Sequence, residues 1–205
     1  RMMALLNQCS LSASGSTLSA IRREITYFRP EGNGQGFWLV YGERKELVQS
    51  LRTFPVTILS ACGQAGKTSQ VPLYLYDRED GGGVICVQSS PDIAQADAQR
   101  VAEQYTHSLA GRRESVVGFL EESTGVAERP EGILFSTDKV LLELLEQADT
   151  PWMPRYPILV IDDALPMKED REQFFLRVGE ALRSHSTLRL LLMTEAKDVT
   201  PLQKL

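Results

Sequence analysis

The feature that most constrains the fold is a glycine-containing loop between an apolar run and a polar helix start. The apolar run Val56–Leu59 precedes the loop, and Gly66-Lys67-Thr68 ends it. A phosphate-binding loop follows a buried strand in this way. Its glycine lets the backbone approach a phosphate, its lysine reaches the outer phosphates, and its hydroxyl ligates Mg²⁺ at the start of a helix whose N–H groups face the anion. The order of these residues therefore predicts a nucleotide site.

Seven consecutive residues are expected to surround the phosphates of a bound nucleotide. They are Gly63, Gln64, Ala65, Gly66, Lys67, Thr68 and Ser69. The full motif has another glycine five positions before Gly66, where this chain has Ala61, and Gly63 supplies the flexibility from a shifted position. The alternative interpretation is a tight strand-to-helix turn that binds no ligand.

The second half of a nucleotide site is an acid at the end of a neighbouring buried strand. The aliphatic run Ile158–Ile161 leads directly into Asp162 and Asp163. We expect Asp162 to hold Mg²⁺ through water and Asp163 to orient the attacking water, with ATP and Mg²⁺ as cofactors. The alternative is a strand that ends in a solvated Asp-Asp turn, since Asp is common at such positions. We interpret the charged stretch from Asp162 to Arg171 as mostly a solvated loop and helix start.

Short apolar runs alternate with helical patterns along most of the chain. Helical spacing is present over 37–51, and helices are expected over 67–76, 91–109, 138–147 and 171–185. Strands are expected over 56–59, 84–87, 133–135, 158–161 and 188–193, with a turn at 81–83. This alternation predicts an α/β fold, a mostly parallel sheet with helices on both faces.

Composition sets limits on the organisation of the chain and on its partners. Residues 1–36 are rich in Ser and Gly and predict a flexible arm with one ordered element within 18–28, and residues 37–205 predict the ATP-binding domain. A net charge of −5 argues against broad nucleic-acid binding. The spacing of the three cysteines, Cys9, Cys62 and Cys86, is not that of metal ligands, so we expect reduced thiols. No apolar run is long enough to span a membrane. We therefore expect an intracellular location, either cytoplasmic or nuclear.

The order of motifs resembles the first RecA-like lobe of the DEAH-box (DEAH/RHA) RNA helicases over about residues 37–200. The most specific piece is Gly66-Lys67-Thr68-Ser69-Gln70-Val71-Pro72, which is similar to the family's G-K-T-T-Q-V/I-P. Further matches are Arg100-Val101-Ala102-Glu103 to R-V-A-E, Val117-Gly118-Phe119 to V-G-Y, Asp162-Asp163-Ala164-Leu165 to D-E-A-H, and Met193-Thr194-Glu195-Ala196 to M-S-A-T.

The resemblance also implies residues that contact RNA, and two departures bear on them. Phe135–Leu142 is similar to M-T-D-G-M-L-L, so Thr137, Asp138 and Lys139 stand where the family contacts RNA, with Lys139 in place of the glycine. The family's T-Q-P-R-R segment corresponds to residues 87–92, where Pro91-Asp92 replaces the arginine pair. An acid there repels the phosphate backbone. We therefore expect only weak binding of single-stranded RNA.

The catalytic motifs depart from the family as well. Asp163 replaces the glutamate of D-E-A-H, which moves the carboxylate back by one methylene, and Leu165 replaces its histidine. Thr194-Glu195-Ala196 keeps one hydroxyl of S-A-T. No second lobe with an arginine finger is expected within 205 residues. The resemblance thus implies the nucleotide-binding lobe of a helicase homologue that alone is a weak or inactive ATPase. Two alternatives stay open: a pseudoenzyme that serves as a protein-interaction module, and a P-loop NTPase completed by a partner chain.

Overall fold

The computed structural model describes residues 22–27, 44–77, 81–108, 116–121, 132–146, 152–165 and 171–203. Its strands are β1 (Arg22–Tyr27), β2 (Val56–Ala61), β3 (Val84–Gln88), β4 (Val117–Phe119), β5 (Ile133–Thr137), β6 (Ile158–Ile161) and β7 (Arg189–Thr194). Its helices are α4 (Arg44–Thr53), α5 (Lys67–Tyr76), α6 (Pro91–Ser108), α7 (Asp138–Leu145), α8 (Glu172–Ser184) and α9 (Thr200–Gln203).

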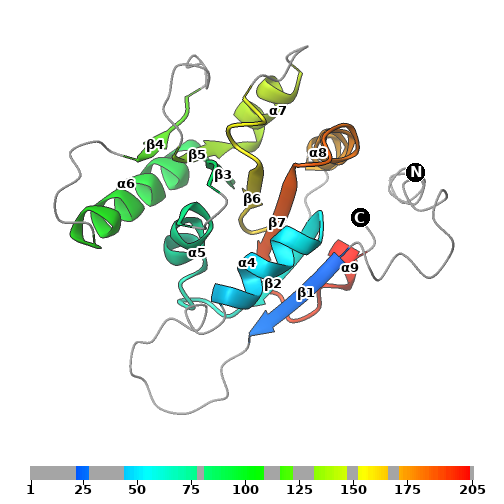
Figure 1. Ribbon diagram of the computed structural model, residues 1–205, viewed down its shortest axis with the longest axis horizontal. Coiled ribbons are helices and arrows are strands. Elements are labelled where there is room, and N and C mark those ends of the chain that lie inside the picture. The colour runs from blue at the N-terminus through cyan, green and yellow to red at the C-terminus, as the bar shows by residue number, and fades with distance from the viewer. Residues whose placement is uncertain are drawn as a thin grey trace, which may run out of the picture.

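The strands form one seven-stranded sheet in the order β1-β2-β7-β6-β3-β5-β4 (Figure 1). Every pair is parallel, with β7 lying between β2 and β6. Parallel neighbours require crossover connections, and most of these contain a helix. The predicted α/β fold with a parallel sheet is therefore confirmed.

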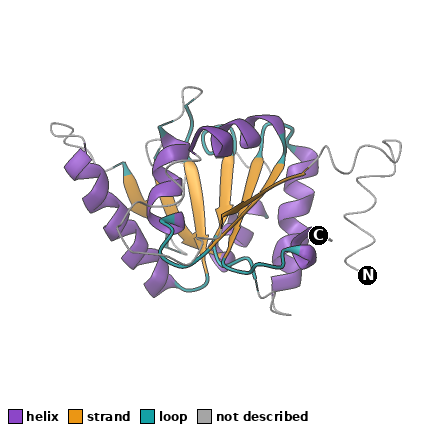
Figure 2. Cartoon of the chain, turned by 90° about the horizontal axis from the view of Figure 1, so that it is seen from below, coloured by secondary structure: helices purple, strands orange, loops and turns teal. Residues whose placement is uncertain are grey.

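The central strands are mostly apolar because helices cover both faces of the sheet (Figure 2). Successive residues of β6 alternate between two cores: Leu159 and Ile161 join one, Ile158 and Val160 the other. The first core contains side chains of α7, α8 and α9, and the second contains side chains of α4, α5 and α6. The sheet is thus the middle layer of three.

The predicted helices and strands occur in the structure with shifts of a few residues at their ends. The helix predicted over 37–51 is described from Arg44 onward as α4, and its earlier part lies outside the described residues. Gly81 and Gly82 both have positive φ, as the predicted turn requires. The three-residue strand β4 and the short helix α9 were not predicted, since neither is long enough to show a period.

The strand β1 lies within the segment predicted to be an arm. Its backbone pairs in parallel with β2, from Arg22 opposite Val56 to Tyr27 opposite Ala61. It is the ordered element expected within 18–28. The rest of residues 1–36 lies outside the described residues.

Candidate functional site

The predicted phosphate loop connects the carboxyl end of β2 to the first residue of α5. Gly66 is the N-cap of α5 and has a left-handed backbone with φ 87° and ψ 13°. A side chain at that φ is strained, so this position requires glycine. Gln64 also has a positive φ of 61°, and Ala65 N donates to Cys62 O at 3.3 Å. The loop is therefore a tight turn that presents the start of α5 at the edge of the sheet.

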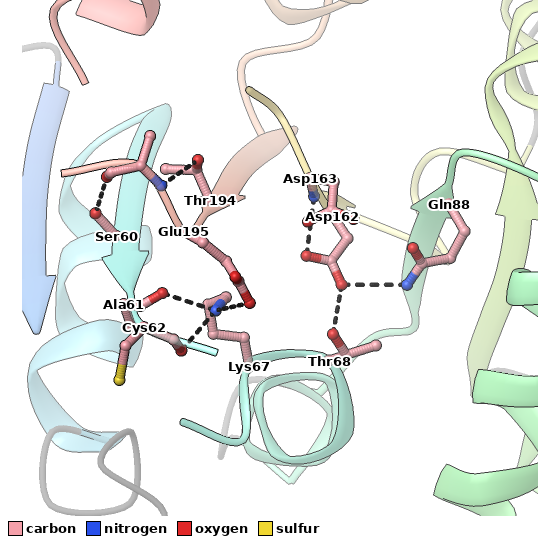
Figure 3. A network of polar contacts seen from close by, with 11 residues as sticks. Ser60, Ala61, Cys62, Lys67, Thr68, Gln88, Asp162, Asp163, Thr194 and Glu195 are labelled. Carbon is pink, nitrogen blue, oxygen red and sulfur yellow. Dashed lines mark hydrogen bonds and ion pairs between the residues drawn. The ribbon is translucent and has the colours of Figure 1, made fainter. Parts of the chain in front are cut away.

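The Lys67 ammonium group lies inside this turn, with only 5% of its side chain exposed. It donates to Ala61 O at 2.8 Å and to Cys62 O at 2.9 Å. Its third acceptor is Glu195 Oε1, at 3.4 Å (Figure 3). An ammonium group has three N–H donors, so this one is fully satisfied within the chain.

Asp162 and Thr68 meet across the sheet edge. Thr68 Oγ1 donates to Asp162 Oδ2 at 2.6 Å, and Gln88 Nε2 donates to the same oxygen at 3.2 Å (Figure 3). The other carboxylate oxygen accepts from the backbone N–H of Asp163 at 3.0 Å. Asp162 is only 4% exposed. The prediction of a solvated stretch is therefore wrong at Asp162, whose carboxylate is fixed by three donors.

Asp163 follows at a turn with a positive φ of 46°. The residue is exposed, and partial desolvation together with the nearby carboxylates of Asp162 and Glu195 raises the pKa of its carboxyl group. Lys67 and Arg171 act in the opposite direction. The acid predicted to orient water thus lies within electrostatic reach of the Lys67 ammonium and Glu195.

Arg171 is buried, which corrects the interpretation of this stretch as a solvated helix start. Its guanidinium forms a bidentate pair with the carboxylate of Asp138, at 2.6 Å and 2.9 Å. Its Nη1 also donates to the backbone oxygen of Asp163 at 3.0 Å, and the group packs against Phe174 and Phe175. Residues 168–170 of the same stretch lie outside the described residues.

The residues predicted to contact RNA lie at the start of α7. Thr137 is buried and caps this helix, since its hydroxyl accepts from Val140 N at 3.4 Å. Asp138 is held by Arg171, and Lys139 is exposed. Pro91 and Asp92 begin α6 and are both exposed. Nothing in the described contacts tests whether these residues bind RNA, so their role remains a prediction.

The segment after β7 brings a further carboxylate to the site. Thr194 is fully buried, and its hydroxyl accepts from Ala196 N at 3.0 Å. Ser60 Oγ donates to Ala196 O at 2.6 Å, which ties the segment to β2. Glu195 lies between these anchors and points to Lys67 (Figure 3).

The sequence did not assign roles at the site to Gln88, Arg171 or Glu195. Gln88 is the last residue of a buried strand, and a buried amide requires a partner, so its position was an available signal. Arg171 gave no such signal, because its partner Asp138 is 33 positions away.

Asp97 lies buried on α6, near enough to the site to feel its charges. Desolvation raises the pKa of Asp97, and the charges of Asp162 and Asp163 raise it further, whereas Arg100 lowers it.

Among the described residues, no group of three or more His, Cys, Asp or Glu side chains could hold a metal ion. Both described cysteines, Cys62 and Cys86, are free thiols. No helix in the described part of the chain is long and apolar enough to cross a membrane.

Comparison with known proteins agrees with the motif order. The chain is 24% identical over 159 residues to the probable ATP-dependent RNA helicase spindle-E of Anopheles gambiae, covering 76% of this chain and 10% of that protein. It is 28% identical over 160 residues to the human ATP-dependent DNA/RNA helicase DHX36, covering 75% of this chain and 16% of that protein. The chain thus spans less than a fifth of the length of these relatives. No known protein-family model matches it.

The fold has a solved counterpart. The Escherichia coli DEAH/RHA helicase HrpB superposes with a TM-score of 0.66 at 23% sequence identity, over 82% of this chain and 21% of HrpB. At that identity the superposition establishes the fold, and the sequence relatives supply the helicase resemblance. The chain therefore has a RecA-like fold and resembles DEAH-box helicases in sequence.

Replacing Arg171 by Met should lower the free energy of unfolding by about 1.5–3 kcal/mol, the range for lost hydrogen bonds to a charged group. Met keeps the packing on Phe174 and Phe175 but leaves the Asp138 carboxylate, 25% exposed, without its bidentate partner. Urea unfolding at neutral pH measures the loss.

The matched control is Arg177→Met on α8. Arg177 pairs with Glu180 at 3.0 Å, but both side chains are about half exposed. Such a surface pair contributes less than about 1 kcal/mol. Equal losses for the two variants would show that the Arg171 pair is no more than a surface contact.

Proposed function

Because the chain resembles DEAH-box helicases in sequence and has their RecA-like fold, we propose that it is a nucleotide-binding lobe that takes Mg²⁺-ATP at the carboxyl edge of the sheet. One observation carries this proposal. The Lys67 ammonium and the Thr68–Asp162 pair lie together at the start of α5, directly after the turn at Gly66. A positive group, a hydroxyl and a carboxylate are what a triphosphate with its metal needs.

The residues present fit Mg²⁺. Thr68 Oγ1 and the Asp162 carboxylate are hard oxygen donors 2.6 Å apart. Mg²⁺ is usually held by one or two such groups together with water and phosphate oxygens. When bound, the ion supplies positive charge beside the outer phosphates. In this proposal Thr68 contacts the metal directly, Asp162 holds it through water, and Gln88 keeps the Asp162 carboxylate in place.

The loop residues have separate tasks in this proposal. The backbone of Gly63, Gln64, Ala65 and Gly66 surrounds the phosphates, and the N–H groups of Lys67, Thr68 and Ser69 at the start of α5 face them. The Lys67 side chain pairs with an outer phosphate. Asp163 orients the water that attacks it.

Replacing Lys67 by Ala should weaken Mg²⁺-ATP binding by about 2–4 kcal/mol, since a charge-assisted hydrogen bond is lost and a phosphate charge is left uncompensated. Calorimetry with a non-hydrolysable ATP analogue measures the two affinities. The same affinity for both proteins would contradict a phosphate role for Lys67. If the unmutated chain binds no nucleotide, the alternative of an interaction module replaces this proposal.

ATP hydrolysis by the isolated 205-residue chain should be barely above background. The reaction needs an oriented water and a positive group for the transition-state charge, and an absent arginine finger costs about 10³–10⁵ in rate. The shorter Asp163 adds a loss near a hundredfold, because displacements of about 1 Å have that effect. A phosphate-release assay measures turnover. Several turnovers per minute that Lys67→Ala abolishes would contradict this expectation.

For RNA, we propose weak binding only. Nucleic-acid binding depends on cations that neutralise phosphates. Asp92, exposed at the start of α6, carries a negative charge instead. Arg171 is already paired with Asp138. Lys139 is the exposed cation of the predicted contact set. The dissociation constant for single-stranded RNA should be about 10⁻⁴ M or higher at physiological salt. An anisotropy titration that gives submicromolar binding would contradict this.

The acidic net charge and the replaced arginine pair favour the second candidate, a pseudoenzyme that serves as a protein-interaction module. A partner chain or second lobe that completes the ATPase is the third. The division into an arm over 1–36 and a domain over 37–205, and an intracellular location, belong to the proposal as well, with the strand β1 of the arm paired to the sheet of the domain.

A further inference from the structure

We propose that Glu195 is an internal anion that competes with the outer phosphates of a nucleotide for Lys67, and that it sets the preference between triphosphate and diphosphate. This inference rests on the proposed nucleotide site. The carboxylate of Glu195 comes from the segment after β7, between the phosphate loop that follows β2 and the acids that follow β6 (Figure 3).

The donors of Lys67 define the competition. Two of its three N–H groups are directed to the backbone oxygens of Ala61 and Cys62, at 2.8 Å and 2.9 Å. Both acceptors are backbone oxygens of the turn itself, so in this proposal they keep their contacts with Lys67 when a nucleotide binds. The third partner, Glu195 Oε1 at 3.4 Å, is the longest of the contacts and the one made by a side chain. A phosphate oxygen that pairs with Lys67 therefore takes the place of Glu195.

The Glu195 carboxylate also lies against the loop backbone. A Cβ atom added to Gly63 would be 3.2 Å from Glu195 Oε1 and 3.5 Å from Oε2. Gly63 is one of the residues proposed to surround the phosphates. The same carboxylate is among the groups that raise the pKa of Asp163. It thus lies among Gly63, Lys67 and Asp163, where an outer phosphate would have to fit.

The backbone on both sides of Glu195 is fixed, but its side chain is not enclosed. The hydrogen bonds of Thr194 and Ser60 to Ala196 hold the segment. The Glu195 side chain itself is 59% exposed. It can rotate into solvent when a phosphate arrives, so the expected effect is a weaker affinity rather than a blocked site.

The charge of Glu195 acts in two ways, both unfavourable to the nucleotide. Binding must break its ion pair with Lys67, and the displaced carboxylate still repels the phosphates nearby. The lysine of a phosphate-binding loop reaches the outer phosphates of the nucleotide. Asp163, which is proposed to orient the attacking water, would lie at the same end of the nucleotide. A nucleoside triphosphate should therefore be penalised more than a diphosphate.

The test is the affinity of the full chain for a non-hydrolysable ATP analogue and for ADP, each with Mg²⁺, by calorimetry. Glu195→Gln keeps the shape of the side chain and removes its charge. The triphosphate analogue should bind about tenfold more tightly to this variant, equivalent to about 1.4 kcal/mol, and ADP should gain less. Glu180→Gln is the matched control, because it removes one exposed acid from an ion pair on α8 and leaves the site unchanged.

A double variant separates competition for Lys67 from general repulsion. In a Lys67→Ala background, adding Glu195→Gln should give a smaller gain than in the unmutated chain, because the ion pair is gone and only the repulsion by the carboxylate remains. A gain of the same size in both backgrounds would overturn the proposal, as would an unchanged or weaker affinity of Glu195→Gln while the unmutated chain binds. If none of these proteins binds either nucleotide, the proposed function fails, and this inference with it.

Discussion

The geometry of the site depends on the burial of one ammonium group. Lys67 begins α5 with 5% of its side chain exposed, and a charge so deeply buried must be paired. The turn after β2 meets this requirement by directing two backbone carbonyls, those of Ala61 and Cys62, to Lys67 Nζ. The left-handed backbone at Gly66 ends the turn directly before Lys67. The remaining donor is satisfied by Glu195, a side chain of the segment that follows the neighbouring strand β7. The parallel order β2-β7-β6 makes this possible, because it brings the carboxyl ends of these three strands to one edge.

Local signals predicted the fold and the elements of the site. The run Ile158–Ile161 and the loop ending at Gly66 are local patterns, and each is found where it was expected. Contacts between distant segments were not predictable in this way. Arg171 looked like a surface charge because its partner Asp138 belongs to another helix, and only the packing of α7 against α8 brings them together. Asp162 looked solvated because Gln88 and Thr68, which bury it, lie on other elements.

Arg171 joins two segments that the resemblance assigns to different tasks. Its guanidinium holds Asp138, in the segment predicted to contact RNA, and the backbone oxygen of Asp163, in the segment predicted to orient water. The same buried guanidinium packs against Phe174 and Phe175. Arg171 therefore connects the start of α7 directly to the turn at Asp163.

The charge balance at this edge of the sheet bears on the proposed binding of a nucleotide together with its metal. The carboxylates of Asp162, Asp163 and Glu195 lie near one another at this edge of the sheet, where Lys67 and Arg171 are the nearby cations that act on Asp163. The acids therefore outnumber the bases in this group of residues. Desolvation is the largest cause of the raised pKa of Asp163, and the negative charges of Asp162 and Glu195 raise it further. A bare triphosphate would add to this negative charge, whereas a triphosphate accompanied by a divalent cation brings compensating charge beside Asp162. In the proposed site, the negative charge that the protein itself keeps near Lys67 would lower the affinity for a nucleotide, and the exposed Glu195 is the carboxylate that pairs with Lys67.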